Sequence, residues 1–183
     1  MGKLKSLKLY IRGESLLHKN IAQMIEMANN LEISERIELT TNASLLTEEM
    51  SKEIIKAGLD YLRVSVYSVY KDRQAYITNS KITPEDIYNN VKNFKNIRDK
   101  MKKIKPFLQV KTLNTFSKEN EDFKELYKNI ADEVYIEEPM NWNDFENSDS
   151  IEKLYPGKKI DRTNLFPNLK KICPIPFYSL CIN

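Results

Sequence analysis

The sequence has little histidine, glycine or cysteine. With His18 as the one histidine in 183 residues, a Ser-His-Asp triad or a histidine-rich zinc site is almost excluded. The four glycines form neither a G-x-G-x-x-G fingerprint nor a Walker loop, so no dedicated cradle for nucleotide phosphates is predicted. The two cysteines, Cys173 and Cys181, both lie near the end of the chain and make neither a disulfide framework nor a complete metal site.

Long apolar runs and a strong excess of one charge are also lacking. No apolar run approaches the ~20 residues that a membrane span needs, and the charged start of the chain lacks the apolar stretch of a signal peptide. We therefore expect a cytoplasmic protein without a membrane partner. The net charge is +3 from 29 basic and 26 acidic residues, which predicts no nucleic-acid partner, and 41% hydrophobic residues predict one folded globular domain.

Five short β-like runs alternate with segments whose apolar residues recur at helical spacing, which predicts a parallel α/β fold. The runs are residues 7–14, 36–42, 61–67, 107–114 and 133–138. Helices are predicted between them, around residues 21–31, 50–55, 83–101 and 123–130, with Thr83 and Pro84 marking the start of the third and Gly58 closing the second. Five of the seven prolines follow residue 138, so we expect a barrel-like domain over 1–138 and a loop-rich extension over 139–183.

Alternation along these strands separates an apolar face from a polar one. The apolar set, which we expect to pack under the helices, is Leu7, Leu9, Ile11, Ile37, Leu39, Leu62, Val64, Val66, Leu108, Val110, Val134 and Ile136. The opposite face is polar in every strand, whereas parallel sheets are normally buried on both faces. This favours a wet cavity inside a curved sheet, with an open, solvent-exposed face as the alternative.

Polar groups gather where the predicted strands end, which is where parallel sheets place their sites. Glu14 could accept hydrogen bonds from a ligand ammonium, and Gly13 would allow a close backbone approach. Asn42, Ser65 and Lys111 share the inward parity and could hold hydroxyls or a carboxylate. Hydrogen bonds to the side chains of neighbouring strands are the alternative role for each of these residues.

Four segments of the chain resemble the radical S-adenosylmethionine (radical SAM) superfamily, in particular members with a SPASM-type iron-sulfur extension. Residues 9–18 look like the second strand of that family, whose G-E-P element binds the methionine amino group, with Ser15 in place of the proline. Residues 40–46 look like its T-N-G segment, and residues 62–67 look like its R-x-S motif, with Tyr67 where Asp is common. Residues 173–183 look like the opening of a SPASM region.

The resemblance implies a partial (β/α)6 TIM-like barrel that lacks its first strand. It implies SAM and 4Fe-4S clusters as cofactors of the full-length member, which would cleave SAM to a 5'-deoxyadenosyl radical that abstracts hydrogen from an unknown small-molecule or peptide substrate. The cofactor-binding residues would be Gly13, Glu14, Asn42, Arg63, Ser65 and Lys111, and Cys173 would be one ligand of an auxiliary cluster.

The C-x3-C-x2-C motif of the family, which holds the catalytic cluster, is missing from this sequence. We therefore expect a fragment that binds no cofactor by itself and is inactive alone. The alternatives are a cluster-free α/β module that binds a small polar metabolite or docks a partner through the open sheet edge at residues 7–14, and a barrel enzyme with Lys111 as nucleophile. Glu137, Glu138, Asn141 and Trp142 are positional candidates for substrate contacts.

Overall fold

The computed structural model describes residues 2–11 and 13–138. Five parallel strands form one sheet in the order β1-β2-β3-β4-β5. They are β1 (Leu7–Lys8), β2 (Ile37–Thr41), β3 (Tyr61–Ser65), β4 (Phe107–Leu113) and β5 (Glu133–Glu137). The helices are η1 (Ser15–Leu17, a 3-10 turn), α1 (Ile21–Asn30), α2 (Glu48–Lys56), α3 (Lys71–Thr78), α4 (Pro84–Lys100) and α5 (Glu119–Tyr127). The predicted α/β class with a parallel sheet is confirmed, and this strand order is that of a partial TIM-like barrel.

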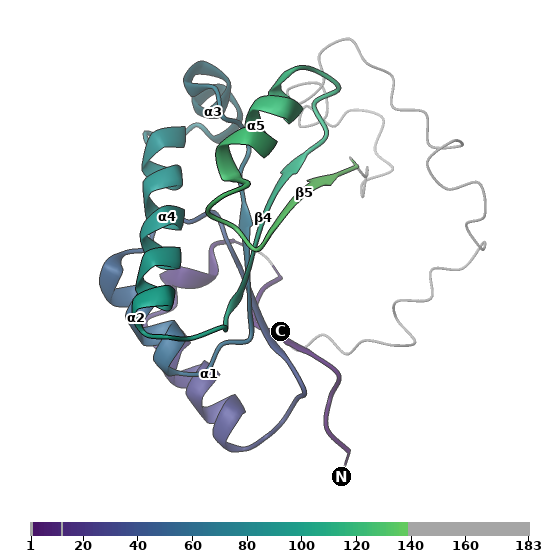
Figure 1. Ribbon diagram of the computed structural model, residues 1–183. Helices are drawn as coiled ribbons and strands as arrows, with labels where there is room; N and C mark the ends of the chain where they lie inside the picture. Colours follow the sequence, from purple (N-terminus) through teal and green to yellow (C-terminus); the bar gives the residue numbers. More distant parts are fainter. Residues whose placement is uncertain (1, 12, 139–183) are drawn as a thin grey trace, which may run out of the picture. The chain divides into compact units, whose positions relative to one another are not determined.

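The helices α1, α2 and α4 lie along one face of the sheet (Figure 1). The sheet presents to them the apolar residues of β2, β3 and β4, and Leu39, Leu62 and Val110 are completely buried there. Ile25 of α1 and Phe94 of α4 are equally inaccessible, and each such side chain contributes roughly 1.5–3 kcal/mol by leaving water. The apolar face of the sheet is therefore the core of the domain, as the alternation in the sequence predicts.

Side-chain caps fix where the helices begin. Thr83 Oγ1 accepts a 3.1 Å hydrogen bond from the Asp86 N–H, and the Asp86 carboxylate accepts a 2.9 Å bond from the Thr83 N–H. This reciprocal pair, with Pro84 at the first helical position, starts α4 at the predicted residue. Gly58 follows α2 at φ +88°, and a Cβ there would lie 2.2 Å from Nδ2 of Asn29, so another residue would be strained and would collide with α1.

The structure corrects three details of the sequence analysis. The helix α3 was not predicted, because Gln74 is its one buried residue and it therefore has no apolar stripe. The strand β1 ends at Lys8 rather than residue 14, so Ile11 is not packed under the helices but is 69% exposed. The predicted helical ranges 21–31 and 123–130 include three apolar residues that are exposed rather than packed in the core, Met24, Leu31 and Leu126, so the covered stripe is narrower than the apolar pattern suggests.

The sequence favours a wet cavity on the polar face of the sheet, but side chains of this face bond one another across the strands. Arg63 Nε donates a 2.7 Å hydrogen bond to Oε1 of Gln109, and Gln109 Nε2 donates a 2.7 Å bond to Glu133. Arg63 also donates to the Tyr10 hydroxyl at 3.2 Å. Glu38 and Gln109 are buried, so cross-strand pairing fills much of this face with its own side chains.

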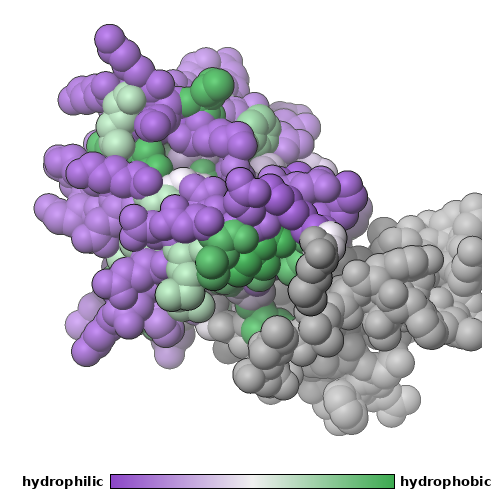
Figure 2. All heavy atoms as spheres, turned by 90° about the horizontal axis from the view of Figure 1, so that it is seen from below, coloured by the Kyte–Doolittle hydropathy of each residue, from purple (hydrophilic) through white to green (hydrophobic). Residues whose placement is uncertain are grey.

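The described residues belong to a compact unit that spans Met1–Asp144. The predicted loop-rich extension over 139–183, with Cys173, Cys181, Asn141 and Trp142, lies outside the described residues. Seen from below, where the strands begin, the described side chains are mainly hydrophilic, with hydrophobic residues gathered in a compact area (Figure 2). Within residues 2–11 and 13–138, no helix is long and apolar enough to cross a membrane.

Candidate functional site

The carboxylate of Glu14 joins the chain segments that follow β1 and β2. Its Oε1 accepts hydrogen bonds from the Leu16 N–H at 3.0 Å and from the Thr41 hydroxyl at 2.7 Å. Its Oε2 accepts a 2.7 Å bond from the Asn42 N–H. A carboxylate offers about four acceptor positions, two on each oxygen. Oε2 of Glu14 therefore keeps one position for a ligand donor such as an ammonium group.

Gly13 gives Glu14 its position by backbone conformation. Its φ is +76°, in the left-handed region that glycine adopts without strain, and a Cβ there would meet nothing within 4 Å. The space beside Gly13 is open among the described residues, and the close approach of a ligand to its backbone stays a prediction. Its conformational role is what the structure shows: the chain turns out of β1 and directs Glu14 back toward β2.

The turn after β2 is rigid. Asn42 Oδ1 accepts a 2.9 Å hydrogen bond from the Ser44 N–H, and the Ala43 N–H donates a 3.0 Å bond to the Thr41 hydroxyl. Asn90 of α4 donates to the Ala43 carbonyl at 2.9 Å, and Ala43 is buried at φ +61°. With its oxygen occupied by Ser44, the side chain of Asn42 retains its NH2 group as a donor, for which the described residues provide no acceptor.

Ser65 and Lys111 are register partners on β3 and β4, so the structure brings these two predicted residues together. Lys111 forms an ion pair with Glu137 of β5. A lysine nucleophile needs a desolvated amine without such a partner, so the pairing argues against Lys111 as the nucleophile of a barrel enzyme. Ser65 thus offers the hydroxyl, and Lys111 and Glu137 a charged pair, at the ends of their strands.

Arg63 lies deeper in the sheet than Ser65. Its guanidinium stands over the Tyr61 ring at 5.5 Å, in addition to its bonds to Gln109 and Tyr10. Burial alone would lower the pKa of Arg63, but its interactions with Tyr10 and Tyr61 have the larger effect, so the pKa of Arg63 is raised. Within the described residues, Arg63 therefore contacts other side chains of the polar face, which is the alternative to ligand binding that the sequence analysis left open.

Two threonines in this site were missed as candidates. Thr41 Oγ1 bonds both Glu14 and the turn, and Thr40 Oγ1 is buried with no hydrogen-bond partner within the described part of the chain. Both belong to the segment 40–46 that resembles a T-N-G element, which is the signal that could have identified them.

The order of these elements agrees with a comparison of the whole sequence with known families. The sequence model of the radical SAM superfamily matches residues 9–129, which include β2, β3, β4 and the Glu14 carboxylate. The chain belongs to the radical SAM superfamily. Full-length members of this superfamily use SAM and a 4Fe-4S cluster.

Two of the curated relatives that match the chain show how much of it they share. It is 30% identical over 157 residues to the "Uncharacterized protein MJ0804" of Methanocaldococcus jannaschii, which covers 84% of this chain and 49% of that protein. It is 36% identical over 77 residues to a protein of Methanopyrus kandleri named "Probable GTP 3',8-cyclase", with 41% of this chain and 23% of that protein covered. The chain thus spans about half the length of the first relative and less of the second.

The described residues fit the two radical SAM cofactors unequally. For SAM, they provide the remaining acceptor position on Glu14, the NH2 group of Asn42 and the orphaned hydroxyl of Thr40, which together suit an amino acid head group. For the cluster, residues 2–11 and 13–138 contain no group of three His, Cys, Asp or Glu side chains that could hold a metal ion. Cys173, the predicted auxiliary-cluster ligand, lies outside the described residues.

Proposed function

We propose that this chain is the SAM-orienting portion of a radical SAM enzyme, of the SPASM type, whose catalytic cluster is held by residues that this sequence does not contain. The observation that carries the proposal is the Glu14 carboxylate. It is fixed by three hydrogen bonds across the ends of β1 and β2 and keeps one acceptor position on Oε2. A site held in this way places charge for a ligand without reorganisation.

Each residue around Glu14 has a part in this proposal. Glu14 accepts a hydrogen bond from the SAM ammonium group, and the NH2 group of Asn42 and the hydroxyls of Thr40 and Ser65 donate to its carboxylate or ribose. Arg63 holds β3 and β4 in register through Gln109 and so positions Ser65. In the full-length enzyme a reduced 4Fe-4S cluster would supply one electron to SAM, which would give methionine and a 5'-deoxyadenosyl radical that would remove a hydrogen atom from a small-molecule or peptide substrate.

We further propose that the chain alone is inactive and binds SAM no more tightly than about 1 mM, which corresponds to roughly −4 kcal/mol. The reason is that the open iron of the cluster, which chelates the methionine end of SAM in the family, has no ligand set among the described residues. The chain spans 49% of the first relative, which supports a functional unit longer than this chain.

The first test is a titration of the full 183-residue chain with SAM, followed by backbone amide NMR. We expect weak, saturable shifts at Asn42 and Ser65, and their loss in Glu14→Gln, whose NH2 group would face the incoming ammonium. Glu26→Gln is the matched control, since Glu26 is exposed on α1. No shift at Asn42 at millimolar SAM would overturn the assignment of the site, and micromolar binding by calorimetry would overturn the dependence on the cluster.

A second test separates this proposal from the cluster-free module. The full chain is reconstituted anaerobically with iron and sulfide, and the protein-bound iron is counted after desalting. We expect no stable four-iron cluster and therefore no SAM cleavage. A persistent brown chromophore with about four irons per chain would overturn the inactive-alone proposal. Shifts of the same residues with polar metabolites but not with SAM would favour the module instead.

A further inference from the structure

A second site lies beside the Glu14 region, between the turns that leave β2 and β3 and the corner that joins α3 to α4. It is a cavity of about 310 Å³. Asn42 and Ser44 contribute from the first turn and Tyr67 from the second, and Gln74 and Ile77 contribute from α3. The volume is at the small end of the range for pockets that hold organic ligands, so it suits a molecule of about one ring.

The described lining of this cavity carries no ionised side chain. Its polar members are amides and hydroxyls, and Ile77, Ile82 and Ile87 supply an apolar wall. A carboxylate, phosphate or ammonium ligand would lose its hydration here without gaining an opposite charge. The composition therefore favours an uncharged ligand with one apolar face and few hydrogen-bonding groups.

Gln74 provides a buried donor with no partner. Its side chain is 1% exposed, and its Oε1 accepts a 3.1 Å hydrogen bond from the Ser68 N–H. Because a backbone N–H can only donate, the amide oxygen must face Ser68 and the NH2 group must lie on the other side. Within the described part of the chain, this NH2 group has no protein acceptor, and Gln74 lines the cavity, so the donor is available to a ligand there.

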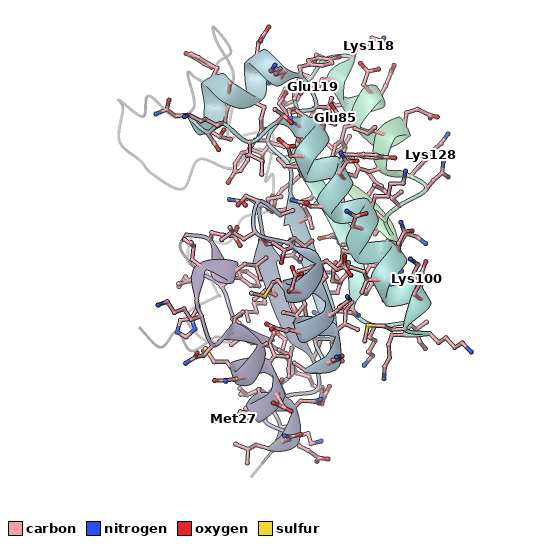
Figure 3. The ribbon with its side chains drawn as sticks, turned by 90° about the vertical axis from the view of Figure 1, so that its left-hand side faces the viewer. Met27, Glu85, Lys100, Lys118, Glu119 and Lys128 are labelled. Atoms are coloured by element: carbon pink, nitrogen blue, oxygen red, sulfur yellow. The ribbon has the colours of Figure 1, made fainter. Side chains whose placement is uncertain are left out.

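The surroundings of Gln74 hold this donor in place. The Ser68 hydroxyl donates to the carboxylate of Glu119, and the same carboxylate accepts a 3.0 Å bond from the Val69 N–H. The Thr78 hydroxyl donates a 2.8 Å hydrogen bond to the backbone carbonyl of Gln74. Figure 3 shows Glu119 close to Glu85, in the first turn of α4, and far from Lys100 at the end of that helix. The cavity wall is thus fixed from α5 through Ser68.

We propose that this cavity binds a small, uncharged, planar molecule with a carbonyl or amide oxygen, which accepts a hydrogen bond from Gln74 Nε2. The Asn42 NH2 group, which also borders the cavity, can donate a second bond. The isoleucine wall covers the flat apolar face of the ligand. The main donor of this site, Gln74, has no part in the SAM proposal, although both sites would use the Asn42 NH2 group.

Benzamide and benzoate make a matched pair of probes, because they share one shape and differ in charge. The full chain is titrated with each, and NMR follows the Gln74 side-chain NH2 and the isoleucine methyls. We expect benzamide to shift Gln74, Ile77 and Ile82 together and to bind at least about tenfold more tightly than benzoate, a factor that corresponds to about 1.4 kcal/mol. Equal binding of the two probes, or no shift of Gln74, would overturn the proposal.

Two variants test the residues. Gln74→Met keeps length but removes the donor, and should weaken benzamide binding about tenfold. In case Gln74→Met does not fold, Ile82→Phe fills the cavity without touching its hydrogen bonds and should abolish benzamide binding, whereas Ile104→Phe on an exposed loop should not. Undiminished binding in Ile82→Phe places benzamide elsewhere and overturns the proposal. The benzamide titration contains no SAM and the SAM titration contains no benzamide, so the two proposed sites fail separately.

Discussion

The backbone N–H of Asn42 donates a 2.7 Å hydrogen bond to the carboxylate of Glu14, 28 residues earlier in the chain. The strand β1 is two residues long, so its ladder with β2 fixes little of the chain that follows. The Glu14 carboxylate supplies the missing constraint, because it bonds the β2 turn and its own 3-10 turn at once. One side chain thus has both a structural and a proposed ligand-binding role.

Glu14→Ala should therefore destabilise the fold. Three hydrogen bonds to an ionised acceptor are lost, and two backbone donors and the Thr41 hydroxyl are left without it, so we expect a loss of about 2–4 kcal/mol in the free energy of unfolding. Urea denaturation followed by circular dichroism measures the loss. The exposed Glu26→Ala should change stability by less than about 0.5 kcal/mol, and an equal effect of both would contradict a structural role for Glu14.

The layout of the fold could be predicted where burial gives a periodic signal. The five strands follow from alternation, because Leu39, Leu62 and Val110 must face the helices. The start of α4 follows from the cap at Thr83. The helix α3 could not be predicted, because it buries an amide rather than an apolar stripe and Tyr70, its N-cap residue, makes no side-chain cap bond.

The residues of the candidate site could be predicted from the sequence, but the hydrogen bonds between them could not. Parity places Glu14, Asn42 and Ser65 at strand ends. Asn42 and Ser65 lie at the ends of β2 and β3, whereas Glu14 lies beyond β1 as the N-cap of η1. Parity also assigned Thr41 to the side opposite Asn42, whereas its hydroxyl bonds Glu14 across 27 residues. A contact between two loops depends on turn geometry, which strand alternation does not contain.

An ion pair between a buried arginine and a partly exposed aspartate gives the next prediction. Arg98 of α4 is nearly inaccessible and bonds Asp132, which also accepts a 2.7 Å hydrogen bond from the Leu108 N–H. Asp132→Asn removes the carboxylate from a partly exposed pair and leaves Arg98 with the Pro106 carbonyl and the longer Asp99 contact, so it should cost about 1–3 kcal/mol. Asp99→Asn is the matched control, since Asp99 contacts Arg98 at 3.4 Å from an exposed position, and should cost less than about 1 kcal/mol. Urea denaturation of both variants measures the difference.

The same carboxylate predicts a pH dependence. Burial raises the pKa of Asp132, but hydrogen bonds from Arg98 and from the Leu108 N–H outweigh burial, and the net pKa lies below the ordinary 3.8. A lowered folded pKa contributes stability above the unfolded pKa and loses it as the pH falls through the folded pKa. Between about pH 5 and 3, the unfolding free energy should therefore fall more steeply in the unchanged protein than in Asp132→Asn. Parallel curves from urea titrations at each pH would contradict this assignment.

The carboxylate of Glu119 should control the order of the β3–α3 turn. It is 4% exposed, accepts bonds from Ser68 and the Val69 N–H, and lies 3.2 Å from Nε of Arg73. Glu119→Gln can keep its amide oxygen on Ser68 and Val69, which both bond Oε1, but a neutral oxygen is a weaker acceptor than a carboxylate and the new NH2 group faces Arg73. We therefore expect a loss of about 1–3 kcal/mol. Hydrogen exchange should show the Val69 amide opening faster.

Glu121→Gln separates this effect from a general loss of charge on α5. Glu121 lies in the same first helical turn but is exposed, so exchange at Val69 should stay as in the unchanged protein. If the Val69 amide stayed protected in Glu119→Gln, other contacts would hold the β3–α3 turn. The side chain of Gln74 would then be positioned without help from α5. If Val69 opens and the exchange of α4 amides is unaltered, the turn is a local unit that Glu119 fastens to the rest of the domain.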